Sequence, residues 1–336
     1  MKKAVTKKGI CKYLTSPFDV EVFATLKSSN LTAKDEIKET KKSNFVVVAR
    51  EQTGGRGRFE RKFFSPKDCG AYFSAVADAD EEKLEYITPL CAVATANAIC
   101  DICGKNAQIK WVNDVFVDGK KCVGILCEAV ASEISSNIDR VVMGIGINLF
   151  EPKGGFDQSV KDRIGIVGEG VFDVGNRIIA KTLDNIYELL SNFDKQRIAD
   201  EYRRRSMLIG KTVTVCKVEK EDKTAKVCDI DEKCRLVVEY QDGQIETLDS
   251  GEVRIKWLRI VRIAVFVALI IVGAFVKFPI GIVPVSMQFA FCMFASLMLG
   301  GLDSFACVAI YIVMGLIGIP VFSAGGGFAY VLQPTF

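Results

Sequence analysis

The sequence predicts an α+β fold in three parts: a domain of strands and helices, a small β-barrel and an all-α transmembrane segment. Strand-like and helix-like patterns alternate over about the first 200 residues, and a stretch of short strands follows them. The 336 residues include 44 basic and 41 acidic ones, yet only four charged residues lie after residue 256. A single water-soluble globule does not distribute charge in this way, because its whole surface faces water.

The composition excludes several classes of protein. There is no histidine, which rules out triads, general bases and metal sites built on that side chain. The net charge of +3 gives no sign of a nucleic-acid partner. The chain has 12 cysteines but no apolar signal stretch at its start, so we expect free thiols in a reducing cytosol. Cys100 and Cys103 form a lone C-x-x-C motif, which we interpret as two core residues of one helix.

Strand patterns recur along the first part as short runs rich in β-branched or aromatic residues. They cover Asn44–Arg50, Ala71–Val76, Gln108–Trp111, Val115–Val117, Cys122–Leu126 and Arg140–Asn148. Asp118-Gly119 lies between the fourth and fifth runs and predicts a two-residue hairpin turn.

Helix patterns alternate with these strands. A helix is expected to start at Asn30, Ile87–Cys103 is apolar over most of its surface and therefore buried, and helices follow from about Val174 to Tyr202. Lys211–Ile255 then contains short strands separated by turns at Glu221–Lys223 and Asp242-Gly243. These strands are Lys211–Val215, Arg235–Tyr240 and Gln244–Leu248. About 45 residues of this kind suit a small barrel.

Three nearly uncharged runs make up the end of the chain: Ile263–Val276, Val285–Leu302 and Phe305–Val321. Each falls somewhat short of the ~20 residues that cross a bilayer, but flanking residues can extend it. Three buried helices of a soluble domain are the alternative, and they lack a polar face for water. Helix breaks are expected at Pro279, Pro284, Pro320 and Gly325–Gly327.

A basic, glycine-rich loop suits an anionic ligand. Gly55-Arg56-Gly57-Arg58 is followed by Arg61-Lys62. Glycine lets the backbone approach a ligand closely, and arginine offers forked donors to phosphate or carboxylate. A solvated basic turn, or an RNA-binding loop, is the alternative.

A second segment sets an amide, a carboxylate and a lysine about one hairpin apart, at Asn113, Asp114 and Lys121. The carboxylate could hold a magnesium ion that bridges phosphates, and the lysine could stabilise charge on a reacting phosphoryl group. Gly144–Asn148 lacks the third glycine of a dinucleotide-binding motif, and Gly210-Lys211-Thr212 lacks the first glycine of a Walker loop.

Together these segments resemble the biotin protein ligase family over about residues 20–255. The matching motifs are Ser28–Asn30, Gln52 with Gly55–Arg58, Lys110–Asp114, Lys121–Leu126 and Gly144–Asn148. Thr247–Val253 resembles the family's C-terminal barrel. The resemblance implies a mixed sheet with helices at 1–206 and an SH3-like barrel at 207–256. The three apolar runs are expected to form a membrane segment at 257–336. Lipoate ligases share the fold but use different loop motifs, and they are the nearest rival enzymes.

The resemblance implies a two-step reaction that uses ATP, Mg²⁺ and biotin. Biotin is joined to AMP, and a lysine of the biotin carboxyl carrier domain of a biotin-dependent carboxylase then takes the acyl group. Catalysis would fall to Lys121, Arg56 and Arg58.

The family's binding residues fall on matching positions of this sequence. Biotin would be bound by Ser28, Ser29, Asn30, Gln52, Gly55, Arg56, Gly57, Arg58, Lys121 and Gly124. ATP would be bound by Arg58, Arg61, Phe63, Asn113, Asp114 and Asn148, with Asp114 on the magnesium ion. The sequence departs from the family at Lys27, where an acidic residue is common, and at Ser29, where threonine is usual. Glu60 stands in place of a glycine, and Phe63 in place of a tryptophan that stacks near adenine.

The end of the chain resembles the start of the biotin-binding membrane component of energy-coupling-factor transporters. Pro284–Gln288, Gly318–Phe322 and Gln333–Thr335 carry this likeness, which covers about half of that component. We therefore expect an incomplete transporter in the lipid bilayer, with other energy-coupling-factor subunits as partners if it were complete. The ligase part is expected on the cytoplasmic side of the cell membrane.

About 20 residues precede the ligase-like region, too few for the DNA-binding domain of some family members, so no DNA partner is expected. A rival hypothesis is a membrane biotin-binding module whose ligase-like domain is not catalytic. An RNA-binding barrel protein is a third, for which affinity would fall steeply with salt.

Overall fold

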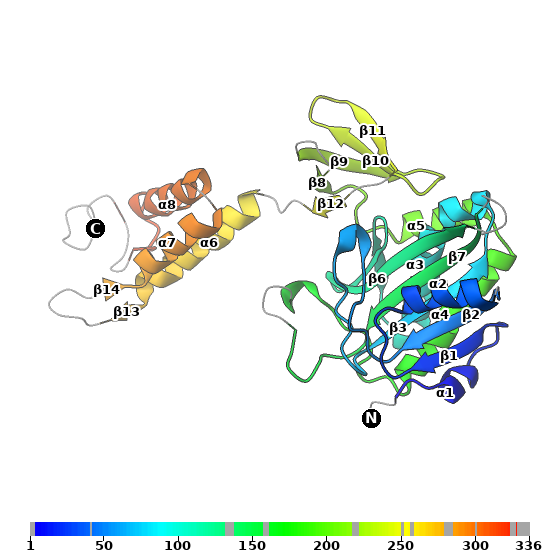
Figure 1. Ribbon diagram of the computed structural model, residues 1–336. Coiled ribbons are helices and arrows are strands. Elements are labelled where there is room, and N and C mark those ends of the chain that lie inside the picture. The colour runs from blue at the N-terminus through cyan, green and yellow to red at the C-terminus, as the bar shows by residue number, and fades with distance from the viewer. Residues whose placement is uncertain are drawn as a thin grey trace. The chain divides into compact units, whose positions relative to one another are not determined.

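The computed structural model describes ten stretches of the chain. These are residues 4–40, 42–131, 138–156, 161–216, 222–249, 252–255, 259–278, 285–299, 301–322 and 327. The chain divides into two units, Met1–Ile255 and Lys256–Phe336, and each is described here by itself (Figure 1).

A seven-stranded mixed sheet forms the centre of the first unit, in the order β1-β2-β3-β7-β6-β5-β4. Its strands are β1 (Asp19–Phe23), β2 (Phe45–Ala49), β3 (Gly70–Asp78), β4 (Ala107–Lys110), β5 (Asp114–Val117), β6 (Lys120–Ala131) and β7 (Ile138–Asn148). Only β1 and β2 pair in parallel, so six of the seven strands form an antiparallel series. The predicted strands and the hairpin turn are confirmed, and Asp118 and Gly119 both have positive φ.

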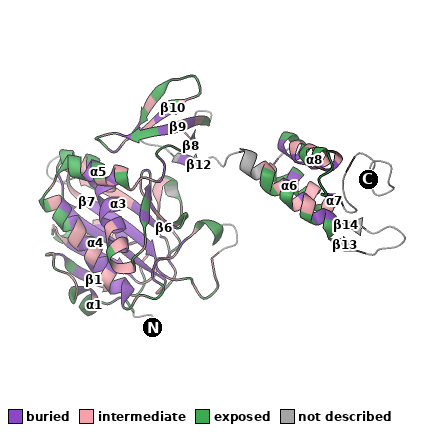
Figure 2. Ribbon diagram, turned by 180° about the vertical axis from the view of Figure 1, so that it is seen from behind, coloured by how far each residue is buried: buried purple, intermediate pink, exposed green. Residues whose placement is uncertain are grey.

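Helices cover both faces of this sheet. One face carries α1 (Lys7–Cys11), α3 (Glu81–Cys103), α4 (Val174–Ser191) and α5 (Lys195–Arg204), and the other carries α2 (Ser29–Thr40). Helix α3 starts where the Asp80 side chain accepts a hydrogen bond from the Lys83 amide, and it ends at Gly104 with φ of 64°. Buried residues lie along the strands and on α3 and α4 (Figure 2).

Strand β2 is buried on both faces and separates two hydrophobic clusters. Phe45 and Val47 pack in the smaller cluster with Ala33 and Ile37 of α2. The alternate residues of β2, such as Val46, belong to the large cluster with α3 and α4. The alternation of side chains along a strand produces this division.

The small barrel region contains five antiparallel strands in the order β11-β10-β9-β8-β12. They are β8 (Thr212–Cys216), β9 (Lys223–Ile230), β10 (Leu236–Tyr240), β11 (Ile245–Leu248) and β12 (Glu252–Ile255). Strands β9 and β12 were not expected. The turn predicted at Glu221–Lys223 is wrong at Lys223, which begins β9, while Glu221 lies outside the described residues. Strand β9 contains two lysines and an aspartate, which are depleted in strands, and its buried residues Ala225, Val227 and Ile230 do not keep a strict period of two.

The second unit contains α6 (Arg259–Phe275), α7 (Gln288–Leu299) and α8 (Gly301–Leu316), with a two-stranded pairing of β13 (Lys277–Phe278) and β14 (Val285–Ser286). Helices are therefore present in all three predicted apolar runs. Large apolar side chains remain exposed on them, including Leu297 at 81% and Leu302 at 80%. The predicted breaks at Pro279, Pro284 and Gly325-Gly326 lie outside the described residues, as does the motif at Gln333–Thr335.

Helix length gives only limited information about membrane crossing. Among the described residues, α3 alone is long and apolar enough to span a bilayer, and it is mostly buried in the core of the first unit. Helices α6, α7 and α8 are apolar but shorter than that limit.

Candidate functional site

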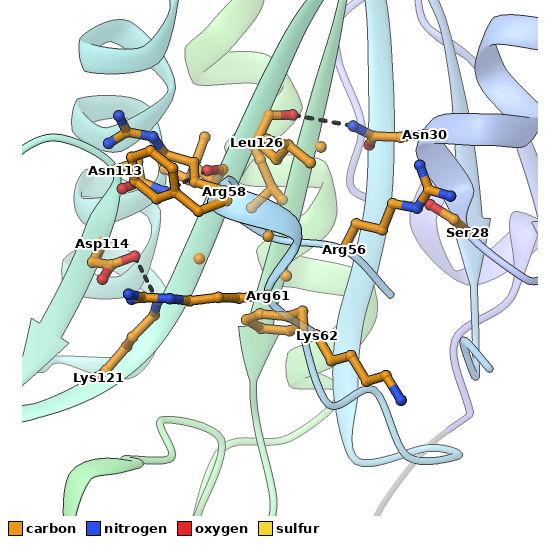
Figure 3. A pocket seen from close by; sticks show the side chains of 18 of the residues that line it. Ser28, Asn30, Arg56, Arg58, Arg61, Lys62, Asn113, Asp114, Lys121 and Leu126 are labelled. Atoms are coloured by element: carbon orange, nitrogen blue, oxygen red, sulfur yellow. Dashed lines mark hydrogen bonds and ion pairs between the residues drawn. The ribbon is translucent and has the colours of Figure 1, made fainter. Parts of the chain in front are cut away.

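A cavity of about 230 Å³ opens on the sheet face that carries α2. The start of α2, the loop after β2 and strands β5 to β7 surround it (Figure 3). Most of the predicted site residues line it: Ser28, Ser29, Asn30, Gln52, Arg56, Gly57, Arg58, Arg61, Phe63, Asn113, Asp114, Lys121 and Gly124. Segments that are more than 90 residues apart in the sequence therefore meet at one place, although the roles predicted for these residues stay predictions.

The floor of the cavity consists of two cross-strand rows with glycine at their centres. Strand pairing aligns Ser74, Gly144 and Leu126 in one row. It aligns Tyr72, Gly146, Gly124 and Asp114 in the next row. The missing side chains in the middle of both rows leave the hollow.

Side chains from neighbouring segments pack directly against these glycines. A Cβ atom at Gly144 would lie 2.1 Å from Asn30 Oδ1. A Cβ atom at Gly146 or Gly124 would lie 2.4 Å or 2.9 Å from the ring of Phe63. The Phe63 ring therefore rests on the glycine floor, where it also meets Tyr72 edge-on at 6.4 Å.

A hydrogen-bonded group of buried and half-buried side chains forms one end of the cavity. The Ser29 amide donates to Gln52 Oε1 at 2.8 Å, and Gln52 Nε2 donates to Ser65 Oγ at 3.0 Å. Ser74 Oγ lies 2.7 Å from Ser29 Oγ and 2.6 Å from Asn30 Oδ1. Because both partners of each bond are held by secondary structure, the polar atoms facing the cavity have fixed positions.

Glu128 lies behind this group on β6. Asn30 Nδ2 donates to Glu128 Oε2 at 2.7 Å and to the Leu126 carbonyl at 3.2 Å, and Lys34 Nζ lies 2.6 Å from Glu128 Oε1. Burial of the Glu128 carboxylate raises its pKa, but the hydrogen bonds from Lys34 and Asn30 outweigh this effect, so the pKa lies below its ordinary value. Glu128 is therefore ionised at neutral pH.

The basic loop folds into a small hairpin at the mouth of the cavity. The Gly57 amide donates to the Arg61 carbonyl at 2.7 Å, and the Phe63 amide donates to the Gly55 carbonyl at 2.9 Å. Phe59 adopts a left-handed φ of 54° between them, and the Arg58 guanidinium lies over its ring at 5.0 Å. The loop thus brings several cations to one cavity, and Arg56 lies beside Ser28 in Figure 3.

An ion pair forms the opposite wall. Lys121 Nζ lies 2.6 Å from Asp114 Oδ1, and this oxygen is buried with no other hydrogen-bond partner among the described residues. Lys121 lines the cavity, while its neighbour Lys120 is exposed. An irregularity in the pairing of β5 with β6, between Lys121 and Val123, lets Lys121 share the cavity face with Gly124. No group of three or more Cys, Asp or Glu side chains suited to a metal ion occurs in the described part of the chain. A magnesium ion at Asp114 would therefore need phosphate oxygens or water as its other ligands.

The barrel anchors the segment that carries Asn113 and Asp114. Trp111 Nε1 donates to the Cys234 carbonyl of the barrel at 3.0 Å, and the Tyr202 hydroxyl of α5 donates to the Val112 carbonyl at 2.9 Å. Burial raises the pKa of Tyr202 well above its ordinary value, so this donor keeps its proton. Asn113 Nδ2 donates to the Ile125 carbonyl at 2.7 Å.

Two predicted site residues are not among those that line the cavity. Gly55 is buried below the loop, where a Cβ atom would lie 2.5 Å from the Phe63 carbonyl oxygen. Asn148 lies at the far end of β7, beside Gly70, and its carbonyl accepts a hydrogen bond from the Val167 amide. The Phe63 ring lies on the glycine floor. Its expected stacking near adenine remains a prediction.

Sequence reasoning missed several residues of the site. Ser74 and Glu128 complete the polar group. Gly144 and Gly146 form the floor; they belong to the motif Gly144–Asn148, but no site role was predicted for them. Phe59, Lys62, Lys110 and Trp111 line the cavity without an assigned role. Glycines two apart within a strand are the one local signal that could have indicated the floor.

The cysteines take no part in this site. All twelve are free, and Cys100 and Cys103 are half-buried at the end of α3. This agrees with their interpretation as core residues of one helix.

Three family profiles match the chain. Residues 22–148 match the biotin/lipoate A/B protein ligase family, residues 208–255 match the biotin protein ligase C-terminal domain, and residues 248–336 match the BioY family. The chain thus joins a biotin protein ligase domain to a C-terminal BioY domain.

Curated relatives match each part separately. The bifunctional ligase/repressor BirA of Bacillus subtilis is 36% identical over 139 residues, which are 41% of this chain and 42% of that protein. The probable biotin transporter BioY of Lysinibacillus sphaericus is 51% identical over 79 residues, which are 24% of this chain and 40% of that protein. The chain spans about two fifths of the length of these relatives.

A solved structure agrees with the fold of the first unit. The biotin protein ligase from Aquifex aeolicus in complex with biotin and ATP superposes with a TM-score of 0.60 at 24% identity, covering 71% of this chain and 99% of the other. At this identity the likeness establishes the fold of the domain.

Proposed function

We propose that this chain, in which a biotin protein ligase domain precedes a BioY domain, is an ATP-dependent ligase that attaches biotin to a lysine of a carrier protein. The observation that supports this most directly is the two-ended cavity. Ser29 and Gln52 offer hydrogen bonds for a polar ring at one end, and the basic loop with Lys121 surrounds the other end. A carboxylate that must react with a phosphate suits such an arrangement.

The proposed chemistry has two steps. A carboxylate oxygen of biotin attacks the α-phosphorus of ATP, and pyrophosphate leaves. The amine nitrogen of the carrier lysine then attacks the acyl carbon, an amide forms and AMP leaves. Arg56 and Arg58 would hold the carboxylate and phosphate oxygens, and Lys121 would stabilise the negative charge that develops on the α-phosphate. Positioning and electrostatics carry such steps, so a histidine base is not required.

Asp114 would contribute one oxygen ligand to Mg²⁺ in this site. Its buried Oδ1, paired only with Lys121 among the described residues, is a fitting donor. A magnesium ion held by Asp114 would offset the negative charge of the nucleotide phosphates. Carriers of the kind that biotin-dependent carboxylases use are the proposed protein substrates.

In this proposal the protein lies in the cell membrane through its BioY domain, with the ligase domain on the cytoplasmic side. Arg259 and Arg262 lie at the start of α6, and basic residues are retained on the cytoplasmic side of membrane helices. A reporter enzyme fused after Ile255 should be active only in the cytoplasm. Activity confined to the outside would contradict this orientation.

Pyrophosphate exchange tests the ligase proposal. The full chain in detergent, given ATP, Mg²⁺ and biotin, should exchange labelled pyrophosphate into ATP and transfer labelled biotin to a biotin carboxyl carrier domain. Exchange with lipoic acid instead of biotin would indicate a lipoate-type ligase. Biotin binding without exchange would indicate a membrane biotin-binding module with a non-catalytic ligase-like domain.

A further inference from the structure

We infer that Cys91 and Cys127 form an oxidisable pair, in which a peroxide converts the two thiols into a disulfide that weakens biotin binding in the cavity. The Cys127 Sγ atom lies 3.9 Å from the Cys91 Sγ atom, although the two residues belong to different elements, β6 and α3. The effect on biotin rests on the proposed function, whereas the formation of the disulfide does not.

The two sulfur atoms meet at the interface between β6 and α3. Cys127 and Glu128 are neighbours in β6 and point to opposite faces of the sheet, so Cys127 faces α3 while Glu128 faces α2. A disulfide bond is about 2.05 Å long, so its formation would shorten the 3.9 Å separation by about 1.9 Å. This closure is small enough for side-chain rotation and a slight approach of the two elements to supply it.

A second cavity, of about 350 Å³, gives an oxidant access to Cys127. It shares Arg58, Asn113 and Leu126 with the first cavity, and Cys127 lies on its wall. Cys91 is completely buried, and this burial raises the pKa of its thiol well above the ordinary value. Cys127 is therefore the sulfur that a peroxide reaches first, and Cys91 is the thiol that reacts second.

The oxidation takes two steps, each of which releases water. The Cys127 sulfur attacks one oxygen of hydrogen peroxide, the O–O bond breaks, and a sulfenic acid and a water molecule form. The Cys91 sulfur then attacks the Cys127 sulfur, the S–O bond breaks, and the hydroxyl group leaves as water with the Cys91 proton. The two thiols thus lose two electrons to the peroxide. Small thiols of a reducing cytosol would reverse the change by thiol–disulfide exchange.

The strand that carries Cys127 also supports the end of the cavity that is proposed to hold biotin. Asn30 Nδ2 donates to the Leu126 carbonyl at 3.2 Å and to Glu128 Oε2 at 2.7 Å, on either side of Cys127. Cys91 lies in the buried middle of α3, so much of the closure falls on β6. A movement of β6 toward α3 by about 0.6 Å, a third of the closure, would lengthen the 3.2 Å contact beyond hydrogen-bond length. The disulfide therefore loosens Asn30.

The test is peroxide treatment of the full chain in detergent. After alkylation of the remaining thiols, peptide mapping should find a cross-linked peptide that contains Cys91 and Cys127. The KM for biotin in pyrophosphate exchange should rise about 3- to 10-fold, while the KM for ATP should stay within about 2-fold. Dithiothreitol should restore both the thiols and the KM. Absence of this cross-link, or a cross-link that leaves the biotin KM unchanged, would overturn the inference.

Three alanine variants assign the response to this pair. Cys127→Ala and Cys91→Ala should each keep the kinetics of the reduced chain and lose the response to peroxide. In Cys91→Ala the sulfenic acid at Cys127 has no partner thiol, so dimedone should trap it. Cys103→Ala removes another thiol of α3 and is the matched control, whose response should equal that of the wild type. A response that persists in Cys127→Ala, or disappears in Cys103→Ala, would contradict the assignment.

Failure of the proposed function can be recognised separately. If the reduced wild-type chain shows no biotin-dependent exchange, the ligase proposal fails. Peptide mapping then still decides whether the disulfide forms. Equilibrium dialysis of labelled biotin decides its effect, because the peroxide-treated wild type should bind more weakly than peroxide-treated Cys127→Ala at one class of site. Identical isotherms would refute the inference.

Discussion

Glycines on the cavity floor leave space because they have no side chain, and side chains from other segments of the chain occupy part of this space. Gly144 leaves room for Asn30, and Gly124 with Gly146 leaves room for the Phe63 ring. At the edge of the second row, Asp114 meets Lys121 across the hairpin. Each of these contacts depends on one atom position, so single substitutions should separate their roles.

Lys121 should matter far more than Lys120. The Lys121→Ala variant loses the cation beside Asp114, and removal of one such donor typically costs on the order of 3 kcal/mol, or about 100-fold in rate. Lys120→Ala changes an exposed side chain and should cost under ~0.5 kcal/mol of stability and no rate. Biotin-dependent pyrophosphate exchange of both variants measures this. Equal activities, or a larger loss in Lys120→Ala, would contradict the assignment.

The Glu128–Lys34 pair should make stability depend on acid pH. Because the pKa of Glu128 is lower in the folded state, its contribution is complete above the unfolded pKa of about 4.3 and is lost as the pH falls through the folded value. The melting temperatures of wild type and Glu128→Gln should therefore differ most near pH 6 and converge toward pH 3. Circular dichroism across this range provides the measurement, and a constant difference would refute the pair's role.

Hydrogen bonds hold in place the segments that line the cavity, and these bonds come from different elements. The basic loop is closed by its own backbone hydrogen bonds, whereas the Lys110–Asp114 segment is held by α5 and by the barrel. The barrel is therefore part of the frame of the site, although it supplies few of the residues that line it.

Trp111→Phe should loosen this frame. It removes the hydrogen bond to the Cys234 carbonyl, which we expect to lower the free energy of unfolding by about 1 kcal/mol. It should also raise the KM for ATP, because Asn113 and Asp114 follow directly. Tyr202→Phe removes the neighbouring anchor and should act in the same direction. Thermal unfolding and exchange kinetics test both variants, and unchanged values in Trp111→Phe would show that the anchor is dispensable.

At the scale of the whole molecule, the two units differ in what covers their apolar side chains. The first unit has a large buried cluster that runs continuously from the sheet into the barrel. The second unit has a small one and exposes Phe289, Leu297, Leu302 and Phe305 at 73% to 81%. An exposed apolar surface of this kind marks a site that a membrane or a partner protein covers.

Residues 1–255 alone should be soluble and active. They contain every residue that lines the cavity and nearly all of the charge. Size-exclusion chromatography should show a compact species without detergent, with KM values for biotin and ATP within about 2-fold of the full chain. The shorter piece 1–206 lacks the barrel side of the shared core and should aggregate. Aggregation of 1–255 while the full chain stays active in detergent would show that the two units fold as one.

The sequence by itself determined the division into parts, the type of nearly every element and the motifs that meet in the cavity. The hydrophobic period, the turn residues and the motif spacing are properties of short segments, so they can be read from the sequence without a structure. The strand β9 was missed because it contains two lysines and an aspartate, and because its buried residues Ala225, Val227 and Ile230 do not keep a strict period of two.

Only the tertiary structure decided which residues of different strands lie side by side in the cross-strand rows of the cavity floor. Ser74, Gly144 and Leu126 come from three strands, and no short pattern records their pairing. The position of Glu128 behind Asn30 depends on strand register and on the docking of α2. Register is a long-range property, since a shift by one residue turns each side chain to the other face of the sheet.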